Sequence, residues 1–112
     1  MVRQRELILV SYPFSEFNAS KVRPAVVVSN DRYNQEFDDV IVVPVTTNLS
    51  LRKHVVRLSD SELEDGHLIT ESVIKVDRIL SVNQKLVRKS IGSVKKDILV
   101  RIRSMIAELL SD

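Results

Sequence analysis

Residues 24–29, PAVVVS, are a proline followed by small and β-branched apolar residues, which is typical of a β-strand. A proline is tolerated at the start of a strand, where its missing N–H need not be paired. Similar stretches flank it on both sides, at 6–12 (ELILVSY) and 39–45 (DVIVVPV). Three closely spaced strands indicate a mainly β protein, and Pro44 predicts an edge or a bulge near the end of the third strand.

The rest of the chain continues this pattern until residue 93. Further strands are predicted at 54–58, 71–76, 78–82 and 87–93, with short helical turns at 30–37 and 59–66. From Val94 the apolar residues recur at steps of one, three and four, which predicts a helix with Ser93 as its N-cap. The apolar positions of this helix are Ile98, Leu99, Ile102, Met105, Ile106, Leu109 and Leu110. We therefore predict a small, strongly bent β-barrel or sandwich with one C-terminal amphipathic helix, forming a single domain over residues 1–112.

The composition excludes several classes of protein. The chain has 112 residues, 44% hydrophobic and 29% charged, as is typical of one folded domain. It contains no cysteine, which excludes disulfides, thiolate metal sites and cysteine nucleophiles. No apolar run approaches the roughly 20 residues of a membrane-spanning helix, and the N-terminus lacks the pattern of a signal peptide, so we expect a cytoplasmic protein. The sequence contains neither a glycine-rich phosphate loop nor a G-x-S-x-G motif.

The net charge of +2 is small, but the charges are segregated along the chain. Residues 59–71 contain five acids and no Lys or Arg, whereas residues 72–103 contain nine bases and two acids. This pattern is compatible with a basic face that attracts phosphates, and also with a solvated surface whose charges cancel. The two histidines, His54 and His67, lack metal-ligand spacing, and the acids of 60–65 lack the pattern of a calcium loop, so we expect no metal or cofactor.

Three short segments place polar side chains at the ends of predicted strands. They are 21–24 (KVRP), which contributes a guanidinium, 46–48 (TTN), which contributes hydroxyls and an amide, and 75–78 (KVDR), which contributes alternating charges. If these ends converge on one rim of the barrel, their cations, hydroxyl donors and carboxylate suit a phosphate diester. The same residues are also compatible with strand punctuation, ordinary turn chemistry and an exposed ion pair between Asp77 and Arg78.

The chain resembles the MazF/PemK (Kid) toxins along nearly its whole length and in the same order. The resemblance is carried by residues 5–10 (RELILV), 21–30 (KVRPAVVVSN), 40–47 (VIVVPVTT), 72–77 (SVIKVD) and 90–93 (SIGS). It implies an SH3-like barrel with a C-terminal helix, assembled as a homodimer. It also implies a metal-independent, sequence-specific endoribonuclease that cuts single-stranded RNA, the toxin of a pair with a cognate antitoxin protein.

Matched position by position, the resemblance implies Arg23 and Thr46 as catalytic residues, with Thr47 lining the RNA groove. An arginine–aspartate pair of the PemK/Kid branch falls on Lys75 and Asp77, with lysine in place of arginine. The loop at 15–20 departs from the family pattern, because it contains neither the glycines nor the histidine found there.

In the mechanism that we expect, the RNA's own 2′-hydroxyl attacks the adjacent phosphorus. Arg23 and Thr46 stabilise the phosphate, Asp77 acts as general base and Lys75 protonates the leaving 5′ oxygen. Further candidates for contacts to the RNA are Lys21, Thr47, Asn48, Arg52 and Lys53. The aromatic residues Phe14, Phe17 and Tyr33 are candidate stacking platforms for bases, with core positions as the alternative for each.

Two other functions stay open from the sequence alone. The same barrel could bind RNA or an antitoxin without cleaving, which the missing loop histidine and Lys75 favour slightly. It could also be a gyrase poison like the CcdB toxins, which share this barrel and act through C-terminal aromatic residues. The chain has no Trp and ends Leu110-Ser111-Asp112, which counts against a gyrase poison.

Overall fold

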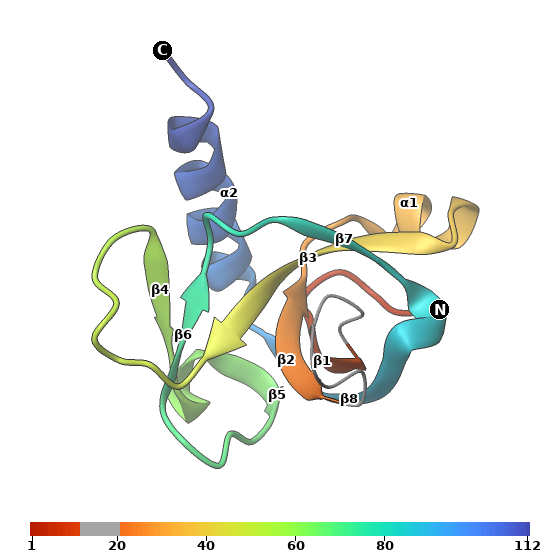
Figure 1. Ribbon diagram of the computed structural model, residues 1–112, viewed down its shortest axis with the longest axis horizontal. Helices are drawn as coiled ribbons and strands as arrows, with labels where there is room; N and C mark the ends of the chain where they lie inside the picture. The colour runs from red at the N-terminus through yellow and green to blue at the C-terminus, as the bar shows by residue number, and fades with distance from the viewer. Residues whose placement is uncertain (12–20) are drawn as a thin grey trace.

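The computed structural model describes residues 1–11 and 21–112. Within them, eight strands form one antiparallel sheet in the order β4-β6-β3-β2-β1-β8-β5, and β7 pairs with β3. The strands are β1 (Glu6–Ser11), β2 (Val22–Val27), β3 (Asp39–Thr46), β4 (Val55–Leu58), β5 (Leu63–Gly66), β6 (Ser72–Lys75), β7 (Leu80–Asn83) and β8 (Val87–Val94). The helices are α1 (Asp31–Glu36) and α2 (Lys96–Leu109), and the 3₁₀ turns are η1 (Asp60–Glu62) and η2 (Gln84–Leu86). Figure 1 shows a curled sheet with α2 rising beyond one side of it and α1 at the other side.

The curled sheet has an apolar core on each face. One core lies between the sheet and α2, where Leu7, Val43 and Ile74 pack with Ile98 and Ile102 of the helix. The other core lies on the opposite face, and its members are Ile8, Val10, Ala25, Val27, Val40, Val42 and Val82. Because neighbouring residues of a strand point to opposite faces, β1, β2 and β3 are apolar on both sides, which explains their continuous apolar runs.

The predicted mainly β barrel with a C-terminal helix is confirmed, and so are the seven predicted strands, within one or two residues at each described end. The helical turn predicted in 59–66 is confirmed as η1, but it covers only Asp60–Glu62, and the rest of the segment forms the strand β5, which pairs with β8. Ser93 lies in β8 instead of capping the helix, and α2 begins after Lys95 without a side-chain cap. Neither α1 nor α2 is long and apolar enough to span a membrane.

Pro44 lies in a central strand and is opposite Ala25 in an unshifted register, so the prediction of an edge or a bulge there is wrong. One side of β3 pairs with β2, and the other side pairs with β7 over residues 39–42 and with β6 at Val45 and Thr46. Pro44 lies where the pairing partner of β3 changes from β7 to β6. Because the Val28 N–H donates to the Ile41 carbonyl at 2.9 Å, the alternation of the ladder turns the backbone of residue 44 away from β2. By the register of the β3–β6 ladder Lys75 would be opposite Pro44, so the missing N–H accounts for the end of that ladder at Val45.

Candidate active site

Arg23 and Thr46 lie on the same face of the sheet, at the same level of neighbouring strands. In the β2–β3 ladder Ala25 is opposite Pro44, and continuing this register by two residues places Arg23 opposite Thr46. Across the other neighbours, Val10 is opposite Arg23 and Thr46 is opposite Val73. Neighbouring strands are about 4.8 Å apart, so the backbones of Arg23 and Thr46, which carry the guanidinium and the hydroxyl, are separated by one strand spacing.

The proline next to Arg23 explains why the β2–β3 ladder ends there. Residues 24 and 45 would form the next hydrogen-bonded pair, and Pro24 has no N–H to donate. The recorded pairing accordingly stops at Ala25 and Pro44, and Arg23 is exposed while Thr46 is half-buried. Among the residues that the structure describes, no carboxylate forms an ion pair with Arg23. Its guanidinium is therefore available to bind an anion from solution.

The Thr46 hydroxyl is held by the turn that follows β3. The Asn48 N–H donates to Thr46 Oγ1 at 3.2 Å, so the hydroxyl oxygen already accepts one bond and its own hydrogen remains for another acceptor. Thr47 and Asn48 are both exposed at this end of β3. The turn thus presents donors beside Arg23, as phosphate binding requires.

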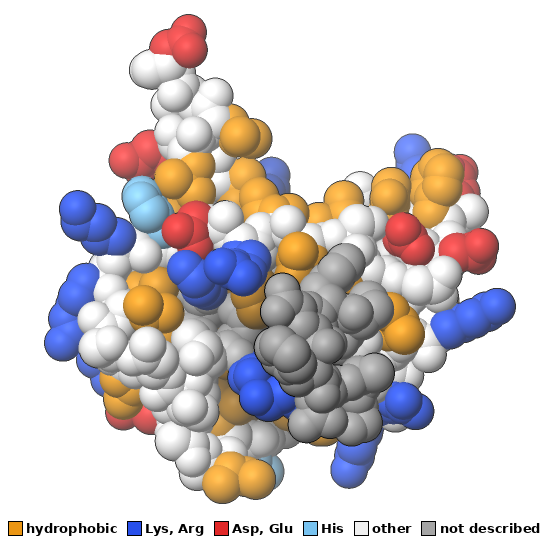
Figure 2. Space-filling model, in the orientation of Figure 1, with side chains coloured by type: hydrophobic (Ala, Val, Ile, Leu, Met, Phe, Trp, Pro, Cys, Tyr) orange, Lys and Arg blue, Asp and Glu red, His pale blue; other side chains and the backbone are white. Residues whose placement is uncertain are grey.

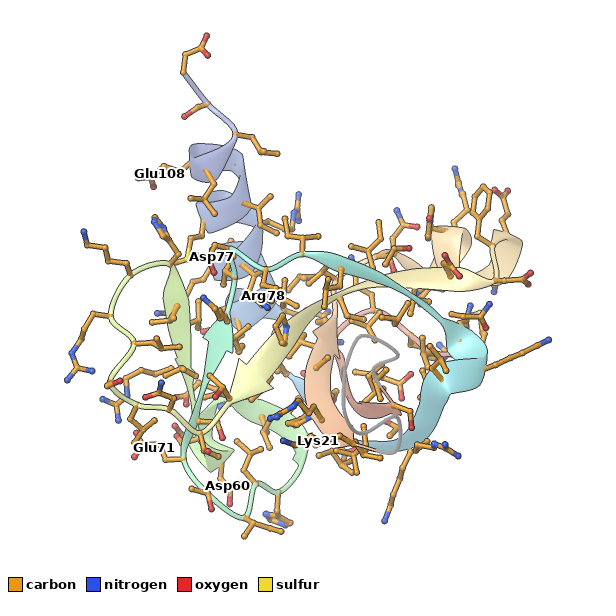
Figure 3. The ribbon with its side chains drawn as sticks, viewed as in Figure 1. Lys21, Asp60, Glu71, Asp77, Arg78 and Glu108 are labelled. Carbon is orange, nitrogen blue, oxygen red and sulfur yellow. The ribbon has the colours of Figure 1, made fainter. Side chains whose placement is uncertain are left out.

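Lys75 and Asp77 lie beside this pair of residues and not at the same rim. Because β6 runs antiparallel to β3, Lys75 lies two residues beyond Val73, about 7 Å along the strand from the level of Thr46. These strand ends therefore do not all meet at one rim, and Figure 3 shows Asp77 and Arg78 at the end of β6 far from Glu71. Lys75 nevertheless shares the face of Thr46, and its Nζ forms an ion pair with Asp77 Oδ1 at 3.4 Å. The carboxylate of Asp77 thus pairs with Lys75 rather than with Arg78.

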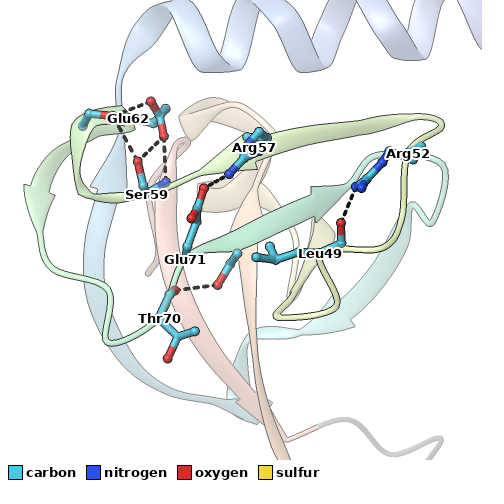
Figure 4. A network of polar contacts seen from close by, with 9 residues as sticks. Leu49, Arg52, Arg57, Ser59, Glu62, Thr70 and Glu71 are labelled. Carbon is cyan, nitrogen blue, oxygen red and sulfur yellow. Dashed lines mark hydrogen bonds and ion pairs between the residues drawn. The ribbon is translucent and has the colours of Figure 1, made fainter.

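Arg57 is a further cation on this face, and the sequence patterns do not reveal it. It lies opposite Val73 in the β4–β6 ladder, so one cross-strand row runs Val10, Arg23, Thr46, Val73 and Arg57. Its guanidinium pairs with the Glu71 carboxylate, as Figure 4 shows. Both residues belong to predicted strands, but only the long-range register brings them to the site.

A hollow of about 310 Å³ lies at the β4 end of this row. Its lining combines aliphatic side chains with three arginines: Leu49, Leu51, Arg52, Val55, Arg57, Val73 and Arg101. Arg52 donates through Nη1 to the Leu49 carbonyl of its own loop (Figure 4), and Lys53 is exposed. Lys21, also exposed, lies at the start of β2 in Figure 3, and Figure 2 shows Lys and Arg side chains scattered over the visible side of the molecule. The face is therefore rich in cations from β2 to β4.

Tyr33, one of the three aromatic candidates, lies away from this site. Tyr33 stacks on Phe37 with ring centroids 4.7 Å apart, on α1. This helix precedes Asp39, at the opposite end of β3 from Thr46, about 23 Å away along the strand. Tyr33 is therefore far from Thr46 within the chain, and Phe14 and Phe17 lie outside the described residues.

The acidic run of the sequence has a structural role. The Glu62 carboxylate accepts bonds from the Ser59 N–H and hydroxyl at 2.7 and 2.8 Å, which confirms the predicted capping pattern. The Ser61 hydroxyl contributes most to lowering the pKa of Glu62, and the Leu68 N–H does the same for the pKa of Asp60. His67 contacts Asp60 at 3.4 Å and is exposed, as is His54. In the described part of the chain no cluster of three His, Asp or Glu side chains could hold a metal ion.

The chain matches one known protein family over nearly its whole length. Residues 3–110 match the model described as PemK-like, MazF-like toxin of type II toxin–antitoxin system. The chain belongs to this toxin family. No curated protein sequence matches the chain.

Solved structures of similar fold support the architecture of this MazF/PemK-family chain. MazF from Deinococcus radiodurans has a TM-score of 0.77 and 22% identity, covering 97% of this chain and 96% of that one. An endoribonuclease in complex with its cognate antitoxin, from Mycobacterial species, has a TM-score of 0.74 and 16% identity, covering 98% and 95%. The toxin MazF-mt6 of Mycobacterium tuberculosis has a TM-score of 0.68 and 19% identity, covering 93% and 90%. At these identities the likeness concerns the fold.

Proposed function

We propose that this protein is a toxin that cuts single-stranded RNA at specific sequences without a metal ion. The observation that carries the proposal is the position of Arg23 and Thr46 on one face, at the same level of neighbouring strands. A guanidinium and a hydroxyl at this spacing can donate to the nonbridging oxygens of one phosphodiester. Membership of the toxin family, and an endoribonuclease among the similar folds, support the same activity.

The proposed reaction is attack by a ribose 2′-hydroxyl on the adjacent phosphorus. A bond forms between O2′ and phosphorus and the bond from phosphorus to O5′ breaks, leaving a 2′,3′-cyclic phosphate and a 5′-hydroxyl. Arg23 and Thr46 stabilise the negative charge that grows on the nonbridging oxygens. The 2′-hydroxyl proton passes to Asp77, and O5′ takes a proton from Lys75. Lys75 shares the face of Thr46 and contacts Asp77, so both groups adjoin the proposed site of the phosphate.

We further propose that the RNA strand continues across the row toward β4. There the hollow offers aliphatic side chains for an unstacked base, and its three arginines face an anionic backbone. A disordered acidic segment of a cognate antitoxin would compete for the same cations. Two copies of the chain are proposed to form a homodimer, as the family resemblance implies.

Cleavage in the presence of EDTA tests this function. The purified protein is incubated with a long single-stranded RNA, and the ends of the fragments are mapped. We expect cuts at a defined sequence that end in cyclic phosphates, are lost in Thr46→Ala, and are unchanged in Arg103→Ala, an exposed arginine of α2. RNA that is bound but stays intact would contradict the enzyme and favour the non-cleaving module. Inhibited supercoiling by gyrase would instead favour the gyrase poison.

Glu71 is predicted to weaken RNA binding in the wild-type protein. Its carboxylate pairs with Arg57 and places a negative charge beside the proposed path of the phosphates. Glu71→Gln keeps the shape and removes the charge, so we expect binding of a 2′-O-methyl single-stranded RNA to tighten about three- to tenfold at low salt. Fluorescence anisotropy at two salt concentrations measures this effect, with Glu108→Gln on α2 as the control. Unchanged or weaker binding would mean that the RNA does not pass Arg57.

A further inference from the structure

The hydrogen bonds of the turn after β3 hold not only the Thr46 hydroxyl but also the side chain of Asn48. Asn48 Oδ1 accepts two bonds from Ser50, one from the backbone N–H at 3.1 Å and one from the hydroxyl at 2.6 Å. A backbone N–H can only donate, so the atom that faces it must be the amide oxygen of Asn48. Both acceptor positions of that oxygen are then filled, and the Asn48 side chain has a fixed orientation.

This orientation turns the NH₂ group of Asn48 away from Ser50. In the described part of the chain no residue accepts a hydrogen bond from Asn48 Nδ2, and the side chain is exposed. Two residues earlier, Thr46 Oγ1 accepts from the Asn48 N–H, which leaves the Thr46 hydroxyl to donate outward. The turn therefore presents two side-chain donors next to each other, and the orientation of one of them is set by Ser50.

We propose that Ser50 is a positioning residue of the RNA site, and that the Asn48 NH₂ group which it orients donates to the phosphate beside the one bound by Arg23 and Thr46. This inference rests on the proposed function, because it concerns the neighbouring phosphate of the same RNA strand. A backbone contact is favoured over a base contact because the exposed Asn48 side chain lies next to the Thr46 hydroxyl, and the cations Arg52 and Lys53 follow in the same loop. The aliphatic residues of this loop, Leu49 and Leu51, instead line the hollow. The contribution of Asn48 is therefore the same for every RNA sequence.

A donor role and a turn-forming role of Asn48 predict opposite orders of variants. Aspartate forms the same turn as well as asparagine does, so for a purely structural role Asn48→Asp is the mildest substitution. For a donor to phosphate it is the most severe, since it keeps the bonds from Ser50 but replaces NH₂ by an anion facing the RNA. Ser50→Ala frees the amide to rotate, and Ser50→Thr restores the hydroxyl.

The test measures the affinity for a 2′-O-methyl single-stranded RNA, which lacks the nucleophile, and, separately, kcat and KM for cleavage of the unmodified RNA. We expect affinity to fall about three- to tenfold in Ser50→Ala and Asn48→Ala. It should fall further in Asn48→Asp and stay near wild type in Ser50→Thr and in Ser111→Ala, whose hydroxyl bonds to Glu108 of α2. In cleavage, Ser50→Ala should raise KM and leave kcat unchanged. Thermal unfolding of each variant verifies that the fold is kept.

The outcomes separate this proposal from the proposed function. If the affinities follow the expected order but the wild type does not cleave RNA, the enzyme is wrong and the donor role of Asn48 stands. If the wild type cleaves and Asn48→Asp is the mildest variant, the donor role is wrong. A changed cleavage sequence in Asn48→Ala would also overturn it, because a phosphate contact reads no base.

Discussion

Arg23→Ala is expected to lower kcat/KM for RNA cleavage about 100- to 1,000-fold, the usual effect of removing a donor aimed at charge that develops in the transition state. Arg23 is exposed and forms no ion pair with a described carboxylate, so its removal takes little from the stability of the fold. Single-turnover cleavage measures the loss, and the melting temperature verifies that the variant is folded.

Arg23→Lys provides the matched comparison for this prediction. Lysine keeps the positive charge but cannot form two parallel hydrogen bonds to a phosphate, so we expect only part of the activity to return. Arg103→Ala, which removes an arginine of α2, should cleave like the wild type. Wild-type activity in Arg23→Ala would remove Arg23 from the mechanism.

Gly66→Ala is expected to destabilise the protein by about 2–4 kcal/mol and to lower its melting temperature by about 10–15 °C. Gly66 has φ 88°, in the region that disfavours any side chain. A Cβ there would lie 2.7 Å from Gly92 Cα and would collide with the Ile91 carbonyl, where β5 pairs with β8. These neighbours are backbone atoms and cannot rotate away.

Differential scanning calorimetry measures the loss in Gly66→Ala against His67→Ala, a change of the exposed neighbouring residue. We expect His67→Ala to melt close to the wild type. Because the paired strands β5 and β8 contribute no residue to the cross-strand row that contains Arg23, the folded fraction of Gly66→Ala should still cleave RNA. A melting temperature equal to that of the wild type would mean that β5 does not approach β8 this closely.

Local sequence patterns predict the strands because the strands are short apolar runs whose burial does not depend on their partners. Residues 24–29 and 39–45 are buried on both faces, and the apolar stripe from Ile98 to Ile102 packs on the sheet. The sequence pattern misses β5 because its sequence, LEDG, is polar. These residues form a strand because Gly66 and Gly92 let the backbones of β5 and β8 approach closely enough to pair. Ser93 fails as a cap because β8 continues through it to Val94.

The candidate site depends on pairings that local sequence does not encode. Arg23 and Thr46 are expected from motifs, but only the β2–β3 register places them at one level. Lys75 and Asp77 are also expected from a motif, and only the antiparallel pairing of β6 with β3 shows that they lie beyond the level of Thr46. Arg57 has no motif, and it joins the row only through the β4–β6 ladder.

The proposal that Arg23 and Thr46 bind the same phosphodiester is tested most directly by a crystal structure of the protein with a 2′-O-methyl RNA that spans a mapped cleavage site. The uncleaved phosphodiester should lie within hydrogen-bond distance of both the Arg23 guanidinium and the Thr46 hydroxyl, with Lys75 on the side of the leaving O5′. An RNA whose cleavable phosphate contacts neither side chain, or only one of the two, would contradict the account.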